Sequence, residues 1–135
     1  MRVLITLPGT GHSLMGPIRD TLQSQAEVWA GALRRNPLPL LYESGIRYQP
    51  EPWAGQGTEE WANPYDVYER GWGDCDDLVL YRVAELIAKG EPATVQTMWK
   101  RGTKRHHVRV RRANGRVEDP SLILLKLAKD TENES

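Results

Sequence analysis

Residues 74–90 carry a complete set of helix signals, and they constrain the fold of this chain more than any other segment. Asp74 is of a residue type favoured at a helix N-cap, and Asp77 stands three positions later, as in a capping box. Gly90 suits the left-handed conformation that follows a helix C-terminus. We therefore predict a helix from Cys75 to Lys89 with one apolar stripe that must be covered. The stripe consists of Leu78, Val79, Val83, Leu86 and Ile87.

The remaining segments predict an α+β fold, with helices first and a compact antiparallel sheet after them. A helix is expected at 17–35, because Pro17 suits a first helical turn and apolar residues recur every three or four positions. The segment 37–63 is rich in proline, glycine and aromatic residues and is expected to be irregular. Asn114-Gly115 is a strong hairpin signal, and Pro120 is expected to stop ladder pairing. Strands are expected at 2–7, 93–100, 106–112 and 116–119.

The length of 135 residues corresponds to one domain. We divide it into an N-terminal strand and helix (1–36), a core (37–128) and a polar tail (129–135) that is expected to be frayed. The single Cys75 excludes an internal disulfide and a cysteine-only zinc site, so a reducing, cytoplasmic setting is the default expectation. No apolar run approaches the ~20 residues of a membrane span, and no membrane partner is expected.

The charge pattern gives no support for a nucleic-acid partner. The 18 Lys and Arg residues balance the 18 Asp and Glu residues, so the net charge favours neither nucleic acid nor an anionic membrane. Aromatic residues do not alternate with the basic residues as a stacking platform would require. The acidic residues 74–77 lack the regular alternation of a calcium loop, and no metal or other cofactor is expected. The basic residues that a nucleic-acid partner would contact are Lys100, Arg101, Lys104 and Arg105.

Three points of the sequence combine residue types that support nucleophilic chemistry. Cys75 lies in the first turn of the predicted helix, where backbone N–H groups and the helix dipole stabilise a thiolate. An imidazole on a neighbouring strand, His106 or His107, would accept the thiol proton. Asp119 follows His107 by 12 residues across the hairpin turn, and its carboxylate would orient the ring. The acidic residues beside Cys75 act in the opposite direction, because like charge disfavours a thiolate.

Each of these residues also has a purely structural interpretation. Cys75 would then be a small, inert residue buried at a helix start. In a strand His106 shares a face with Val108 and would be a neutral core residue supporting the hairpin. Asp119 would be a turn residue before a proline.

The segment Gly73-Asp74-Cys75-Asp76-Asp77-Leu78 resembles the nucleophile motif of the transglutaminase-like cysteine peptidases, a superfamily with a papain-like core. The segment His107-Val108-Arg109-Val110, with Glu118-Asp119-Pro120-Ser121 after the turn, resembles the His strand and the Asp-Pro-Ser/Thr motif of that superfamily. A third segment, Tyr42-Glu43-Ser44-Gly45-Ile46-Arg47-Tyr48, is similar to a motif of the small transglutaminase-like proteins of tailed bacteriophages and prophages. The resemblance extends from about Leu41 to Leu124.

This resemblance implies a papain-like or transglutaminase-like core in which the nucleophile helix packs on a small antiparallel sheet. It implies that Cys75 is the nucleophile, His107 the base and Asp119 the orienting acid, with Asp77 a structural cap beside Asp74. The implied activity is cysteine-dependent acyl transfer on a peptide or protein amide, as in a peptidase, amidase or transglutaminase. The implied setting is a phage or prophage protein, in the cytoplasm of a bacterial host or in a virion.

Two features depart from the family pattern. Val108 and Arg109 follow the histidine, where the family often has an aromatic residue. No side chain matches the oxyanion donor securely, although the indole N–H of Trp61 or Trp72 could serve beside the backbone N–H of Cys75. The alternative function is therefore a catalytically inert structural or tail-associated phage protein that retains the fold and binds other virion proteins.

Overall fold

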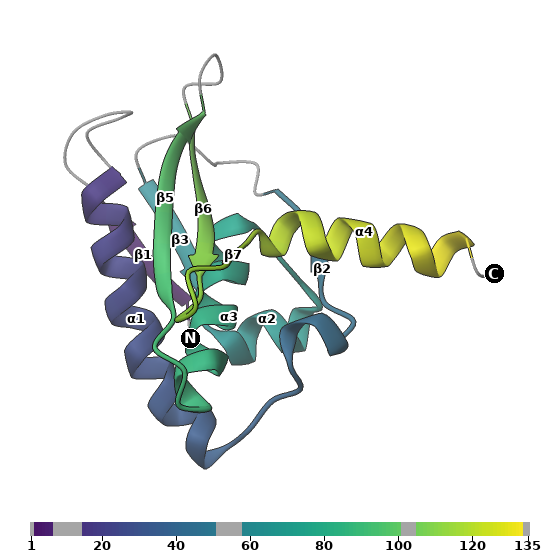
Figure 1. Cartoon of the computed structure of the whole chain (residues 1–135), viewed down its shortest axis with the longest axis horizontal. Coiled ribbons are helices and arrows are strands. Elements are labelled where there is room, and N and C mark those ends of the chain that lie inside the picture. The colour runs from purple at the N-terminus through teal and green to yellow at the C-terminus, as the bar shows by residue number, and fades with distance from the viewer. Residues whose placement is uncertain (1, 7–14, 51–57, 101–104, 134–135) are drawn as a thin grey trace.

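The computed structural model describes residues 2–6, 15–50, 58–100 and 105–133 and shows a mixed α+β fold (Figure 1). Its helices are α1 (Met15–Arg35), η2, a 3-10 turn (Leu41–Glu43), α2 (Pro64–Arg70), α3 (Cys75–Ala88) and α4 (Pro120–Asn133). Its strands are β1 (Arg2–Thr6), β2 (Arg47–Tyr48), β3 (Thr58–Ala62), β4 (Trp72–Gly73), β5 (Thr94–Lys100), β6 (Arg105–Arg111) and β7 (Val117–Glu118).

The strands form three small sheets. β1 pairs antiparallel with β3, with Val3 opposite Trp61. β2 pairs parallel with β4 through two residue pairs. The order of the third sheet is β5-β6-β7, all antiparallel, and β7 meets β6 only through Val110–Glu118 and Arg111–Val117. The predicted antiparallel hairpin and its short return strand are therefore confirmed.

Helix α3 lies at the centre of the molecule, and every side chain from Asp76 to Leu86 is buried. One side of α3 packs with α1 against the face of β5 and β6 that carries Val95, Val108 and Val110. The other side packs against η2, α2 and the first turns of α4. Each fully buried valine or leucine contributes about 1.5–3 kcal/mol relative to an exposed one. The expectation that this helix packs on a small antiparallel sheet is met.

The predicted ends of α3 are both present. The Asp77 backbone N–H donates to the Asp74 carboxylate at 3.0 Å, and the Asp74 N–H donates to the Asp77 carboxylate at 3.3 Å, which completes a capping box. Gly90 has a φ of 95°. At that end the Gly90 N–H donates to the Ile87 carbonyl and the Glu91 N–H to the Leu86 carbonyl, both at 2.9 Å, as in a Schellman motif.

The C-terminal region differs from the prediction. We expected residues 129–135 to be a frayed tail and Pro120 only to end the sheet, but α4 runs from Pro120 to Asn133. The Ile123 N–H donates to the Asp119 carbonyl at 3.0 Å, so Asp119 occupies the N-cap position and Pro120 the first helical position. The helix forms because Leu124 packs into the core beside Ile46 and Leu41. Within the described residues, no helix is long and apolar enough to cross a membrane.

The segment expected to be irregular contains short elements. Residues 37–63 include η2, β2 and β3, and α2 follows immediately. The side chain of Asn63 accepts the Asp66 N–H at 3.0 Å, and Pro64 begins the helix. This is a standard N-terminal signal that the density of prolines and aromatics had obscured.

Candidate functional site

The imidazole of His107 contacts the carboxylate of Asp119, with 2.6 Å between Nε2 and Oδ2. His107 lies within β6, and Asp119 lies between β7 and α4. Both side chains are about 15% exposed, so solvent reaches the pair and screens it only in part. The contact occupies Nε2, so Nδ1 is the ring nitrogen that points away from Asp119 and can serve a second group.

Asp119 is held from two further directions. Its Oδ1 accepts the Leu122 N–H at 3.4 Å, and its backbone carbonyl accepts the first helical hydrogen bond of α4. The carboxylate therefore has one oxygen toward the helix and the other toward the imidazole. A carboxylate fixed in this way sets both the position and the tautomer of the ring, with the Nε2 hydrogen on the Asp119 side.

Cys75 is the first residue of α3, and its half-buried side chain packs against the core shared by α1, α3, β5 and β6. Its Sγ lies 3.9 Å from Oδ1 of Asp76. Asp76 is buried, and its Oδ2 accepts the indole N–H of Trp61 at 3.2 Å. The N–H groups at the start of the helix favour a thiolate at Cys75, whereas the nearby carboxylate of Asp76 disfavours it.

Two ion pairs fix how α3 lies along β6. In the first pair, Arg82 of α3 binds Glu118, which lies opposite Val110 of β6 in the sheet. In the second pair, Glu91, just after the end of α3, binds Arg112, just after the end of β6. The helix and the strand therefore run in the same direction (Figure 1). Cys75 precedes Arg82 by seven residues, about 10 Å along a helix.

His107 precedes Val110 by three residues, about 10 Å along a strand. Cys75 and His107 each lie about 10 Å before the Arg82–Glu118 ion pair, measured along their own elements. Alternation along β6 places Val108 and Val110 on the face that packs against the helices. His107 and Arg109 lie on the other face of β6. Asp119 contacts His107 on that face, beside the edge of β6 that β7 no longer pairs with. The side chain of His106 lies outside the described part of the chain.

The two predicted oxyanion donors have different surroundings. Trp61 is buried, at 1% exposure, and its indole N–H donates to Asp76. Trp72 is half-buried, and the guanidinium of Arg70 lies 3.8 Å from its ring centroid.

Asp74 and Asp77 have the structural role that was expected of them. Asp77 is fully buried and accepts the Ala62 N–H at 2.8 Å and an N–H of Arg70 at 2.7 Å, in addition to the capping hydrogen bond. Burial raises the pKa of Asp77, while the Ala62 N–H and Arg70 act to lower it. Asp77 therefore ties α3 to β3 and α2, and its oxygens point into the protein.

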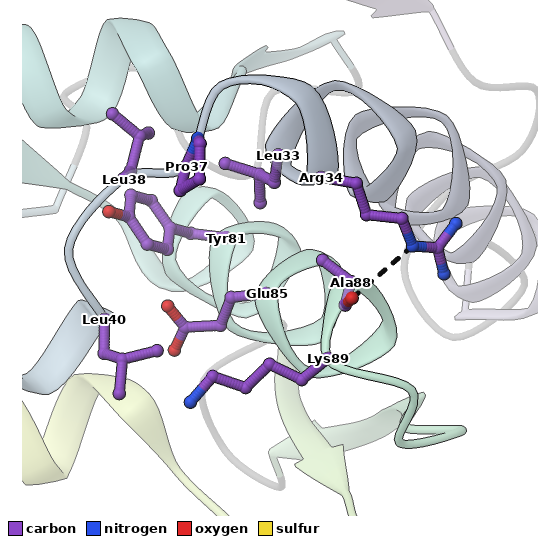
Figure 2. A pocket seen from close by; sticks show the side chains of 9 residues that line it. All are labelled: Leu33, Arg34, Pro37, Leu38, Leu40, Tyr81, Glu85, Ala88 and Lys89. Atoms are coloured by element: carbon purple, nitrogen blue, oxygen red, sulfur yellow. Dashed lines mark hydrogen bonds between the residues drawn. The ribbon is translucent and has the colours of Figure 1, made fainter.

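A mainly apolar cavity is present at the opposite end of α3 from Cys75. It has a volume of about 290 Å³ and lies between the end of α1, the segment 37–40 and the last turns of α3 (Figure 2). Both oxygens of Glu85, which lines it, are occupied by Arg82 and the Leu41 N–H. Cys75 lies ten residues before Glu85, about 15 Å along the helix, so this cavity is separate from the candidate site.

Among the residues described, His, Cys, Asp and Glu side chains do not form a group of three that could hold a metal ion. Comparisons of the chain with models of protein families, with curated proteins and with solved structures find no match. The functional argument therefore rests on the chemistry and geometry of the site.

Proposed function

We propose that this protein is a cysteine-dependent acyl-transfer enzyme with a papain-like, transglutaminase-like core. The observation that carries the proposal is the 2.6 Å contact between His107 and Asp119, which is the imidazole–carboxylate half of the expected triad. The roles are Cys75 as nucleophile, His107 as base and then acid, and Asp119 as the orienting carboxylate. The sequence resemblance to phage and prophage transglutaminase-like proteins supports the same assignment.

Alternation along β6 puts His107 on the face away from α3, so the proposed reaction takes place past the edge of β6 that β7 leaves unpaired at this level. There Nδ1 of His107 accepts the thiol proton of Cys75. The thiolate attacks the carbonyl carbon of an amide, and the carbonyl oxygen becomes an oxyanion near the Cys75 backbone N–H, with the Trp72 indole as a side-chain candidate. The C–N bond then breaks, the leaving amine takes the proton from the imidazolium, and a thioester remains on Cys75. Water or a second amine, deprotonated by His107, attacks the thioester, and the thiol is released with its proton restored.

The substrate class is a peptide or protein amide, and the proposed setting is a bacteriophage or prophage. The half-buried site suits an extended or flexible segment whose carbonyl can approach the first turn of α3. Transfer to water would give a peptidase or amidase, and transfer to an amine would give a transglutaminase.

The test is the rate of alkylation of Cys75 by iodoacetamide at pH 7, with glutathione as the reference. An ordinary thiol is only a few per cent thiolate at this pH, so an imidazole-paired thiolate is expected to react about tenfold faster. His107→Gln and Asp119→Asn should lower the rate toward that of glutathione, and Cys75→Ala should abolish labelling. His106→Gln tests the other histidine that the sequence leaves open as the base, and with His107 as the base it should leave the rate unchanged.

A wild-type rate equal to that of glutathione would remove the enzyme proposal, and so would a fast rate that His107→Gln does not change. Equal effects of His106→Gln and His107→Gln would instead indicate a change in folding. Circular dichroism of each variant separates that outcome.

A second function, that of an inert interaction protein, is favoured by one observation. Helix α4 projects from the body of the molecule (Figure 1) and exposes Leu122 (63%) and Leu125 (42%), which are three residues apart and share a face of the helix. Neighbouring apolar side chains on an exposed helix are typical of a binding surface. An ordinary thiol rate, combined with loss of binding to a virion protein in Leu122→Lys, would support this function.

A further inference from the structure

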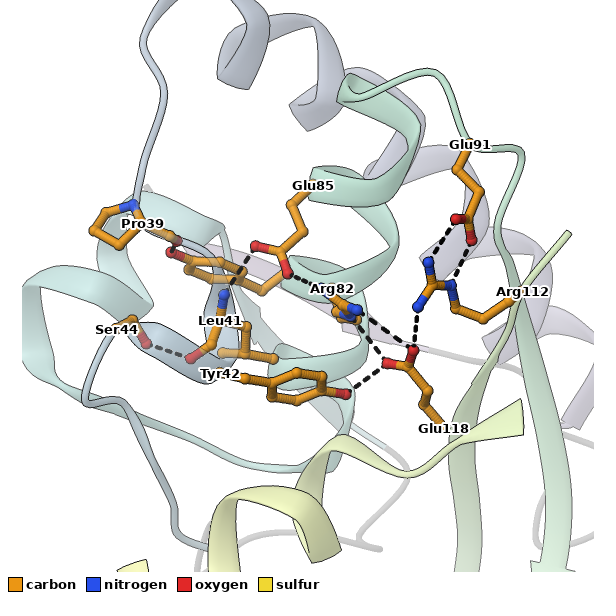
Figure 3. Close-up of polar contacts among 10 residues, drawn as sticks. Pro39, Leu41, Tyr42, Ser44, Arg82, Glu85, Glu91, Arg112 and Glu118 are labelled. Carbon is orange, nitrogen blue, oxygen red and sulfur yellow. Dashed lines mark hydrogen bonds and ion pairs between the residues drawn. The ribbon is translucent and has the colours of Figure 1, made fainter. Parts of the chain in front are cut away.

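The carboxylate of Glu118, the residue immediately before Asp119, is surrounded by hydrogen-bond donors (Figure 3). Its Oε1 accepts the hydroxyl of Tyr42 at 2.7 Å and Nε of Arg82 at 2.9 Å. Its Oε2 accepts Nη1 of Arg112 at 2.8 Å and a longer contact from Nη2 of Arg82 at 3.4 Å. The Glu118 side chain is 11% exposed, so these donors replace most of the water that a carboxylate would otherwise bind.

The donors are themselves fixed by further contacts. Arg82 also binds Glu85 at 2.6 Å, and its guanidinium lies 4.6 Å from the ring centroid of Tyr42. Arg112 also binds both oxygens of Glu91 at 2.6 Å, in the fork geometry that makes Arg–carboxylate pairs specific. We call this group the Glu118 cluster, and it consists of Tyr42, Arg82, Glu85, Glu91, Arg112 and Glu118.

The cluster joins segments that are far apart in the sequence. Its members come from η2, α3, the turn after α3, the end of β6 and β7. In contrast, the backbone holds β7 in the sheet by only two residue pairs. The contacts of the Glu118 side chain therefore add a second constraint on β7 to its short ladder and the turn before it.

The direction of this constraint leads to the candidate site. Because successive residues of a strand point to opposite faces, Glu118 points toward α3 while Asp119 points to the face that carries His107. Any displacement of Glu118 moves the backbone from which the Asp119 carboxylate extends. A displacement of about 1 Å is enough to cost an oriented catalytic group much of its effect.

We propose that Tyr42, Arg82 and Arg112, acting through Glu118, are positioning residues that hold the Asp119 carboxylate against the imidazole of His107. The catalytic meaning of this inference rests on the proposed function, but the positioning itself does not. The arrangement lowers the pKa of Glu118 to about 2, because the donors outweigh the opposing effect of burial. Glu118 is consequently ionised at neutral pH and accepts from all three donors.

The experiment compares Tyr42→Phe with Tyr81→Phe. Each change removes one tyrosine hydroxyl that donates a 2.7 Å hydrogen bond in the same region, Tyr42 to Glu118 and Tyr81 to the Pro39 carbonyl. The loss of stability should therefore be similar, but only Tyr42→Phe loosens Glu118. Glu118→Gln is the stronger variant, because it keeps the size of the side chain and removes the charge that both arginines bind.

The primary readout is the proton NMR signal of the His107 Nε2–H, which appears far downfield when an imidazole N–H donates to a carboxylate at short distance. We expect the signal to be sharp in the wild type and in Tyr81→Phe, and broadened or lost through solvent exchange in Tyr42→Phe and Glu118→Gln. The second readout is the alkylation rate of Cys75, expected to fall about threefold in Tyr42→Phe and to be unchanged in Tyr81→Phe.

The two proposals can fail separately. If wild-type Cys75 reacts as an ordinary thiol, the enzyme proposal fails, and the NMR comparison still decides the positioning role. If the His107 signal persists unchanged in Tyr42→Phe and Glu118→Gln, or in the one of these two variants that folds, the positioning role is overturned. This holds even if Cys75 is reactive. If Tyr81→Phe broadens the signal as much as Tyr42→Phe, the effect is one of general stability and the inference is also overturned.

Discussion

Replacement of Asp77 by alanine should be among the most destabilising single changes in this protein. The carboxylate is fully buried and accepts N–H groups from Ala62, Asp74 and Arg70, the last through an ion pair of 2.7 Å. Alanine would remove the acceptor of two backbone hydrogen bonds, at about 1–3 kcal/mol each. It would also remove the ion pair with Arg70, whose side chain is 14% exposed, and breaking such buried pairs costs about 3–5 kcal/mol.

These costs overlap, because the same local relaxation relieves all three groups. We expect a net loss of about 4 kcal/mol for Asp77→Ala, a large part of the ~5–15 kcal/mol by which a domain is stable. Asp77→Asn keeps an oxygen acceptor and should lose about 2 kcal/mol. Asp74→Ala removes the N-cap hydrogen bond from the Asp77 N–H and should lose about 1 kcal/mol.

Urea unfolding followed by far-UV circular dichroism measures these differences from the shift of the midpoint at constant slope. The expected order of stability is wild type, Asp74→Ala, Asp77→Asn and Asp77→Ala. A loss below about 1 kcal/mol for Asp77→Ala, or a greater loss for Asp74→Ala than for Asp77→Ala, would refute the view that Asp77 ties three elements together.

Two further predictions concern pH and glycine. Because the pKa of Glu118 in the folded protein is about 2, below the ordinary value of a glutamate, its contribution to stability is complete above about pH 4.5 and is lost as the pH falls toward 2. The loss should be about 2 kcal/mol, and Glu118→Gln should flatten the fall in unfolding free energy over this range. Gly73→Ala should destabilise the fold by about 1–3 kcal/mol, because a Cβ there would lie 3.0 Å from the Asp77 Cβ and 3.3 Å from a methyl of Leu78. Gly31→Ala in α1 should instead stabilise it by about 0.5–1 kcal/mol, since the new Cβ would approach only Arg35, at 3.9 Å. Thermal unfolding of the two glycine variants should shift the midpoint in opposite directions, and a shift in the same direction would contradict this account.

The parts of the fold that sequence predicted well are those specified by local signals. The cap at Asp74, the stripe of α3 and the stop at Gly90 all lie within one short segment, and the structure contains all of them. Helix α2 has an equally local signal in Asn63-Pro64, but the surrounding prolines and aromatics favoured an irregular segment. Helix α4 was missed because Pro120 was interpreted as the end of a strand, whereas it is also the start of a helix.

The candidate site was predictable only in part, for a similar reason. The 12-residue spacing of His107 and Asp119 across one hairpin led to the expectation that they meet, and the 2.6 Å contact is present. Their catalytic roles, and that of Cys75, stay predictions. The Glu118 cluster was not foreseen, because Tyr42, Arg82 and Arg112 come from separate segments and converge only through tertiary packing. The hydrogen bond between Trp61 and Asp76 is non-local in the same way, and it engages the indole N–H of a predicted oxyanion donor.

The carboxyl group of Asp119 makes two independent hydrogen bonds, one with the Leu122 N–H in the first turn of α4 and one with the imidazole of His107 in β6. Fewer substitutions should therefore be tolerated at residue 119 than if its side chain made only one of these two hydrogen bonds. Asparagine can still accept the helix N–H but carries no charge. Glutamate keeps the charge on a longer side chain, and alanine can make neither hydrogen bond. A saturation screen at residue 119 would therefore separate, in one library, substitutions that harm folding from those that harm only chemistry.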